Sequence, residues 1–195
     1  MEQGLEIQGK IFFRPCVDVY GLWRGDKKMI EFRNINGDNI DEVIALDVED
    51  NQKEFILNTT NLRCFADAHM LNTDGIPASP LAIYANDTMV GFLMYIYDTT
   101  DHESFQNEVF YGKKTYFIWH FMIDKSYQGK GYGKLAFEKM LSDIETMPYG
   151  EAENVDLFYH KSNVIAKELY ASFGFVETGI IQDNSVHAIK HIDGK

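Results

Sequence analysis

The sequence predicts one α/β (α+β) domain in which helices cover both faces of a mixed β-sheet. Two observations predict this class. β-rich runs and helical periodicities alternate from Met29 onward, and a glycine-containing turn at 128–133 joins an apolar strand to an amphipathic helix and a further strand. Such a β-α-β unit crosses over right-handedly and makes its two strands parallel. With 195 residues, 45% of them hydrophobic, the chain has the length and composition of a single globular domain.

The individual elements follow from changes in the period of the apolar residues. Asn86-Asp87 has the composition of a tight hairpin turn, and Asn163 and Gly174 stand where a helix begins and stops. The predicted strands cover 29–35, 81–84, 89–97, 115–123, 155–159, 175–181 and 186–192, and the predicted helices cover 38–47, 52–70, 135–144 and 163–173.

Residues 1–28 precede this pattern as an N-terminal extension. Their apolar runs are broken by Pro15 and by the turn-like Arg24-Gly25-Asp26, a pattern compatible with an extra hairpin. These apolar residues would suit a homodimer interface, but the sequence does not define the oligomeric state. The main domain is expected to cover 29–195.

Composition excludes several classes of function. The chain carries 18 basic and 30 acidic side chains, so its formal charge of −12 repels nucleic acid and favours cationic partners, unless the acidity serves solubility alone. It contains no run of eighteen apolar residues and no signal-peptide pattern at its start, which predicts a cytoplasmic protein without membrane spans. Cys16 and Cys64 share no close spacing with each other or with histidines, so no disulfide and no metal site is expected.

The segment Gln128–Gly133, followed by Lys134, predicts a site for a diphosphate. A turn of this kind directs backbone N–H groups and the positive end of a helix dipole at one point. Gly129, Gly131 and Gly133 permit positive φ angles and close approach of a ligand, and Lys130 and Lys134, on either side of Tyr132, add positive charge. An ordinary strand-to-helix turn is the alternative. The turn follows the fourth strand and lacks a Ser or Thr after Lys134, which argues against dinucleotide-binding folds and P-loops.

Two motifs resemble the GNAT superfamily of N-acetyltransferases. Gln128, Gly131 and Gly133 fill its Gln/Arg-x-x-Gly-x-Gly/Ala motif between strand four and helix three, and 163–175 is similar to its second motif, with Asn163 opening a helix and Tyr170 seven residues on. The resemblance implies acetyl-CoA as the co-substrate and a mostly antiparallel sheet with a splay between strands 4 and 5. The pantetheine arm would lie in that splay and pair with the backbone near Met122 and Ile123.

The resemblance also implies roles for side chains. Tyr170 would protonate the leaving thiolate, against the alternative of a buried core tyrosine, and Asn163 would bind the cofactor besides capping its helix. A base must make the attacking amine neutral. His120, on the same strand as Met122, is one candidate, while a satisfied structural histidine or an ordered water are the alternatives.

The acceptor is predicted to be a cationic amine. Acidic residues are concentrated between Asp38 and Glu54, where helices one and two of the GNAT fold border the acceptor groove, and Glu49 and Asp50 are the candidates to bind the distal ammonium groups of a polyamine. A solvated helix face is the alternative explanation for this acidity.

The chain further resembles bacterial diamine and spermine/spermidine acetyltransferases at Gln52, Phe55, Asn61, Leu62 and 65–68. Another small amine or a protein N-terminus is an alternative acceptor. A non-catalytic acetyl-CoA-binding regulatory module is an alternative function, which the presence of Tyr170 disfavours.

Overall fold

The computed structural model describes residues 29–56 and 60–192 of the chain. The predicted extension 1–28, including Cys16, lies outside the described residues. The strands are β1 (Ile30–Asn34), β2 (Ala78–Ala85), β3 (Thr88–Thr99), β4 (Lys114–Ile123), β5 (Asn154–His160), β6 (Val176–Gln182) and β7 (Ser185–His191). The α-helices are α1 (Ile40–Ala45), α2 (Asn61–Thr73), α3 (Tyr132–Ile144) and α4 (Val164–Ser172), and the 3-10 helices are η1 (Asp50–Ile56), η2 (Glu103–Phe105) and η3 (Lys125–Tyr127).

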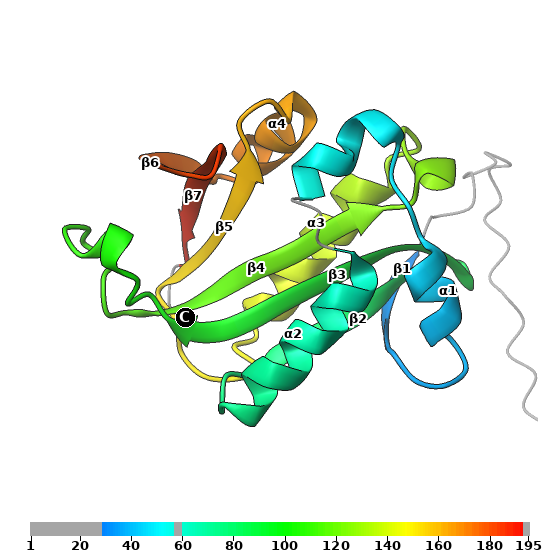
Figure 1. Cartoon of the computed structure of the whole chain (residues 1–195), viewed down its shortest axis with the longest axis horizontal. Helices are drawn as coiled ribbons and strands as arrows, with labels where there is room; N and C mark the ends of the chain where they lie inside the picture. Colours follow the sequence, from blue (N-terminus) through cyan, green and yellow to red (C-terminus); the bar gives the residue numbers. More distant parts are fainter. Residues whose placement is uncertain (1–28, 57–59, 193–195) are drawn as a thin grey trace, which may run out of the picture.

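The seven strands form one mixed sheet in the order β1-β2-β3-β4-β5-β7-β6 (Figure 1). Every neighbouring pair is antiparallel except β4 and β5, which are parallel and connected through α3. The prediction of a mixed, mostly antiparallel sheet with one β-α-β unit is therefore confirmed.

Two tight turns fix the register of the antiparallel hairpins. Asn86 and Asp87 both have positive φ, 49° and 67°, as the two central residues of a type I′ turn do. Asp183 and Asn184 repeat this conformation between β6 and β7, with φ of 45° and 66°. Asn and Asp tolerate the left-handed region because their short polar side chains can hydrogen-bond locally, so both hairpins are encoded by local sequence.

β4 and β5 separate part of the way along their length. Their pairing runs from Thr115↔Asn154 to Ile118↔Leu157 and stops there, and in Figure 1 the two arrowheads point apart. At the same level β4 contains a bulge, because its pairing with β3 passes from Ile118 directly to His120. Trp119 therefore has a partner on neither neighbouring strand. The predicted splay is confirmed, and the bulge coincides with its start.

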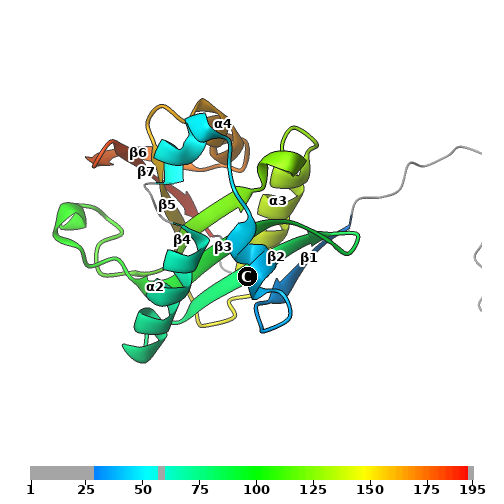
Figure 2. The same cartoon turned by 45° about the vertical axis from the view of Figure 1, so that its right-hand side comes forward.

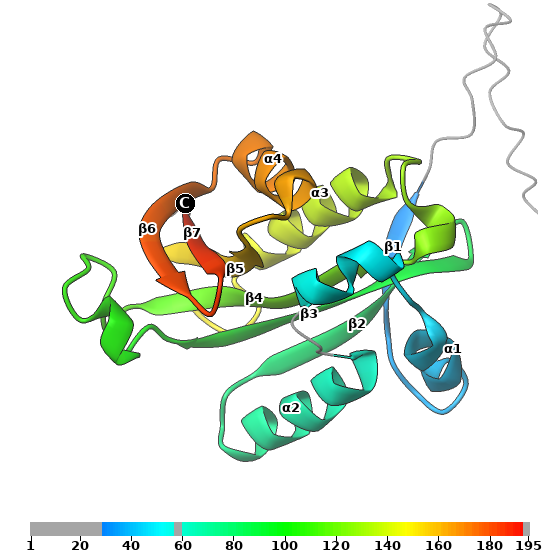
Figure 3. The same cartoon turned by 45° about the horizontal axis from the view of Figure 1, so that its top comes forward.

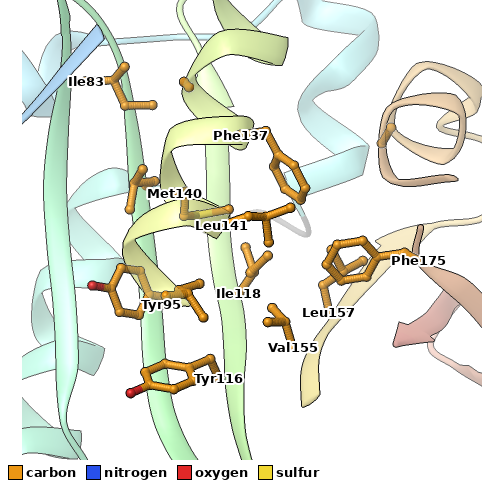
Figure 4. Close-up of a cluster of buried hydrophobic side chains, with 14 of the residues drawn as sticks. Ile83, Tyr95, Tyr116, Ile118, Phe137, Met140, Leu141, Val155, Leu157 and Phe175 are labelled. Carbon is orange, nitrogen blue, oxygen red and sulfur yellow. The ribbon is translucent and has the colours of Figure 1, made fainter. Parts of the chain in front are cut away.

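The sheet separates two hydrophobic cores. One lies against α3 and α4 and includes Ile118, Phe137, Leu157 and Phe175, drawn in Figure 4. The other lies on the opposite face, beneath α1 and α2, and includes Phe92 and residues of both helices. Figures 2 and 3 show this layering, with α1 and α2 on one side of the sheet and α3 and α4 on the other. The bulge at Trp119 turns the later residues of β4 over, which places Met122 in the second core.

One predicted helix is wrong in its extent. The apolar period over 52–70 predicts a single helix, but the structure has η1 over Asp50–Ile56 and a separate α2 that begins at Asn61. Thr60 has extended backbone angles, and its side chain accepts a hydrogen bond from the Arg63 N–H, so it caps the start of α2.

Cys64 of α2 is a free and fully buried thiol, and burial raises its pKa to about 12. None of the helices in 29–56 and 60–192 has the length and apolar character needed to cross a membrane.

Candidate active site

The glycine turn lies between the end of β4 and the first turn of α3. Gly129 and Gly131 have left-handed φ angles of 71° and 83°, and a Cβ on either would meet nothing within 4 Å, so their outer face is open to a ligand. Gly131 directly precedes α3, whose first backbone N–H groups have no partner within the helix. The turn thus has the form that a diphosphate requires.

Gly133 differs from the other two glycines. It lies inside the first turn of α3 and is absent from the positive-φ residues, so only Gly129 and Gly131 use the left-handed region that glycine permits. A Cβ at Gly133 would lie 3.6 Å from Ile123 Cγ1. Its small size therefore serves the contact between α3 and the end of β4.

Charged groups border the turn as predicted. Lys130 is exposed, and its ammonium donates to the Ser126 carbonyl at 2.7 Å and lies 5.3 Å from the centre of the Tyr127 ring. Lys134 is exposed on the first turn of α3, next to the half-buried Tyr132. These side chains keep positive charge beside the open face of the glycines.

The side chain of Gln128 connects the glycine turn to two other segments through hydrogen bonds. Its Nε2 donates to the Ile123 carbonyl at 2.9 Å and to Gln52 Oε1 at 2.9 Å, while Gln52 Nε2 donates back to Gln128 Oε1 at 3.0 Å. The side-chain amide is thus engaged by protein groups, and it joins η1 to the turn.

The segment before η1 is attached to the same turn. The Asp47 N–H donates to Asp124 Oδ2 at 2.9 Å, and the Lys125 N–H donates to the Asp47 carbonyl at 2.9 Å. The Lys125 ammonium also donates to Asp47 Oδ2 at 3.0 Å, and this hydrogen bond lowers the pKa of Asp47. At the other end of η1, the ring of Phe55 stacks on His160 of β5 at 5.7 Å. The stretch 47–55, which contains the cyan η1 in Figure 3, therefore bridges the open ends of β4 and β5.

A pocket of about 850 Å³ occupies the splay. Its walls come from both sides of the sheet: α2, η1 and the loop after β3 on one side, and α4 with Asn163, the residue just before it, on the other. Of the sequence-predicted residues, His120, Asn163 and Tyr170 line it together. Met122 and Ile123 do not line the pocket, because their side chains are buried in the two cores beyond it.

Tyr170 lies on α4 with its half-buried ring against aromatic neighbours. Phe137, Tyr159 and Phe175 lie within 5.1–6.1 Å, centroid to centroid. Burial raises the pKa of Tyr170 to about 12, so its hydroxyl stays protonated at neutral pH. In the described part of the chain this hydroxyl has no hydrogen-bond partner. It is an available proton donor at the pocket wall.

Asn163 caps α4 as predicted. Its Oδ1 accepts from the Ala166 N–H at 3.0 Å, which leaves the amide Nδ2 without a partner among the described residues. The cap orients the side chain at the rim of the pocket, so both predicted roles of Asn163 are compatible.

Two buried polar atoms of the pocket wall have no partner in the described structure: His120 Nε2 and Ser185 Oγ. Such orphaned groups are rare and call for an explanation, for example a bound ligand. His120 is 6% exposed and lies 5.5 Å from the Phe92 ring, and burial lowers its pKa to about 4. The imidazole is therefore neutral at neutral pH, and accepting a proton would create a buried cation.

The acidic residues of the pocket are not the ones that the sequence indicated. Glu49 and Asp50 do not line it, and Asp50 pairs with Lys53 at 2.6 Å on the surface. Five other carboxylates line it, against one guanidinium, that of Arg63, which pairs with Asp67 at 2.7 Å. The five are Asp67, Asp98, Asp101, Asp156 and Asp183. They come from α2, β3 and the loop after it, β5, and the β6–β7 turn, and no local motif marks them as a group.

Comparison with known proteins defines the class. The model of the family described as "Acetyltransferase (GNAT) family" matches residues 42–175. The chain belongs to this family, and it is an acetyl-CoA-dependent N-acetyltransferase.

Its relatives are individually distant. The chain is 27% identical over 156 residues, 80% of its length and 93% of the relative's, to a probable spermine N(1)-acetyltransferase of Bacillus subtilis subsp. natto (strain BEST195). The crystal structure of spermidine N-acetyltransferase from Vibrio cholerae in complex with CoA and spermine superposes with a TM-score of 0.61 at 14% identity, over 84% of this chain and 95% of that one. An aminoglycoside N(6′)-acetyltransferase from Legionella pneumophila gives 0.59 at 20% identity, over 84% and 92%. At these identities the two structures establish the fold alone.

The open face of the glycine turn leads to a first prediction. Gly131→Asp places a carboxylate at the proposed diphosphate position and should abolish acetyl-CoA binding in isothermal calorimetry. Gly131→Asn is the matched control, because Asn tolerates the left-handed backbone and adds no charge. Equal affinity of Gly131→Asp and the wild type would contradict the placement of the diphosphate.

The paired glutamines lead to a second prediction. Gln52→Ala should weaken acetyl-CoA binding by roughly fivefold, since it removes hydrogen bonds worth about 1 kcal/mol from the turn. Gln128→Ala should weaken binding at least as much, because it also removes the hydrogen bond to the Ile123 carbonyl. The double variant should lose little more than Gln128→Ala alone, because the interaction between the two glutamines is shared. Exposed Glu54→Gln in η1 is the control. Additive losses in a calorimetric double-mutant cycle would show that the two side chains do not act as a pair.

Proposed function

We propose that this acetyltransferase acetylates a primary amine of a polyamine such as spermidine or spermine. The observation that carries the proposal is that Tyr170, Asn163 and five carboxylates line one and the same pocket in the splay. A polyamine is an extended polycation, so its distal ammonium groups suit several carboxylates placed around one cavity. The net formal charge of −12 acts in the same direction over longer distances.

The donor would be held by groups already described. The turn 128–131 and the first turn of α3 would bind the diphosphate of acetyl-CoA, with Lys130 and Lys134 alongside. Asn163 would donate its Nδ2 to the pantetheine arm in the splay. When bound, acetyl-CoA supplies an acetyl group activated as a thioester.

Two features of this chain would promote the transfer. Trp119 offers backbone groups that belong to neither the β3 nor the β5 ladder, and its N–H is suited to stabilise charge on the acetyl oxygen. Tyr170 would protonate the leaving thiolate. For the base, His120 is one candidate that the sequence offers, but the burial of its imidazole acts against that role.

The acid role of Tyr170 leads to a third prediction. Tyr170→Phe should bind acetyl-CoA with unchanged affinity and lower kcat by about 10²- to 10⁴-fold, because only the proton donor is lost. Since the raised pKa keeps the hydroxyl protonated, the wild-type rate should not decline on the basic side below about pH 10. The release of free thiol from acetyl-CoA measures both kcat and its dependence on pH. A Tyr170→Phe variant with wild-type kcat would exclude the role.

The acceptor wall leads to a fourth prediction. Asp98→Asn, Asp101→Asn and Asp183→Asn should each raise KM for spermidine severalfold, consistent with about 1 kcal/mol for a partly exposed ion pair, and should affect a monoamine less. The double change Glu49→Gln and Asp50→Asn tests the alternative site given by the sequence. An equal rise in KM for both amines in every variant would refute recognition of a second ammonium group, and no thiol release with any amine of a panel would refute the proposed function itself.

A further inference from the structure

Asp156 lies at the point where the splay begins. It is paired with Phe117 of β4, one step before the last β4–β5 pair, Ile118↔Leu157. Leu157 belongs to the core under α3 and α4, so the preceding Asp156 faces the other side of the sheet, toward α2 and the acidic wall. Its side chain is 2% exposed and lines the floor of the pocket.

The Asp156 carboxylate is held in place by a threonine hydroxyl and a histidine ring. Thr115 Oγ1 donates to Oδ1 at 2.9 Å, and His187 Nε2 lies 3.3 Å from Oδ2. His187 is fully buried, and its Nδ1 lies 3.1 Å from the Thr178 hydroxyl, which fixes the ring. No Lys or Arg of the described ranges forms an ion pair with Asp156. One partner at each oxygen leaves Asp156 able to accept further hydrogen bonds.

A buried carboxylate without a Lys or Arg partner is costly, because desolvation is offset only by a cation or by enough hydrogen bonds. Asp156 lines the pocket, so a ligand in the pocket can reach it. A protonated amine at this position would supply both a positive charge and a further hydrogen-bond donor.

Burial acts against His120 as the base. A histidine becomes charged when it accepts a proton, and burial disfavours the charged form, which lowers the pKa of His120 to about 4. The interior of the pocket therefore opposes proton transfer to His120.

We propose that Asp156 is the group that removes the proton from the acceptor ammonium, with Thr115 and His187 as positioning residues; this rests on the proposed function. One N–H proton passes from the ammonium to the carboxylate, which becomes a carboxylic acid, and the freed electron pair of the nitrogen forms the C–N bond with the acetyl carbon. The C–S bond breaks, its electrons remain on sulfur, and the thiolate takes the proton of Tyr170. The second N–H proton of the product nitrogen leaves to water, and Asp156 and Tyr170 return to their starting states by exchange with solvent.

The test compares two acceptors in the full-length protein. With spermidine, Asp156→Asn should lower kcat by about 10²- to 10⁴-fold while leaving acetyl-CoA affinity unchanged. With a spermidine analogue carrying fluorine beside the terminal nitrogen, which is largely neutral at the assay pH, the loss should be less than about tenfold, because no base is needed. Asp156→Glu should restore part of the kcat for spermidine.

Other outcomes overturn the proposal. An equal loss of kcat for both acceptors would show a merely structural role for Asp156, and a larger loss in His120→Gln than in Asp156→Asn would assign the base to the imidazole. If Asp156→Asn fails to bind acetyl-CoA, Thr115→Val carries the test: it should lower kcat for spermidine about tenfold at constant KM, and an unchanged kcat would refute the proposal. In all of these cases wild-type turnover of spermidine leaves the proposed function intact.

Discussion

The loss of hydrogen bonding between β4 and β5 after Ile118↔Leu157 is the constraint on which the site depends. Two parallel strands that stay paired leave no room for a ligand, whereas here their backbones diverge and a pocket of about 850 Å³ lies between them. Unpaired backbone in a protein interior is costly unless something satisfies it. The bulge at Trp119 falls at the same level, so both edges of β4 offer backbone groups where the splay begins. An acetyl donor lying in the splay would satisfy them.

The donor side and the acceptor side are mechanically connected. Stretch 47–55 contacts the glycine turn through Asp124, Lys125 and Gln128, and it reaches β5 through the stacking of Phe55 on His160. The same stretch contributes Phe55 to the pocket wall, and Ile56 follows it there. A shift of the turn on binding acetyl-CoA would therefore act on the pocket wall at Phe55. This connection covers one side of the splay.

Buried polarity distinguishes the site from the rest of the interior. The two cores are apolar, yet the pocket is lined by the buried residues Asp156, Ser185 and His120, of which the last two have polar atoms without a partner in the described structure. Such groups lower stability when unsatisfied, so their presence together in one cavity is explained best by a ligand that completes their hydrogen bonds. The position of the carboxylates around this cavity favours a cationic acceptor, in keeping with the acidity of the whole chain.

The sequence by itself determined the features that are local. The Asn-Asp turn at 86–87, the cap at Asn163 and the glycine turn each depend on a few adjacent residues whose backbone preferences are strong, and motif spacing then led from them to the fold and the co-substrate. Tertiary structure alone decided the break between η1 and α2, the helical conformation of Gly133, and the acceptor wall. That wall gathers five carboxylates from four separate segments, whereas the local acidity around Glu49 and Asp50 lies outside the pocket. The physical reason is that hydrophobic packing and strand register, not sequence proximity, determine which side chains share a cavity.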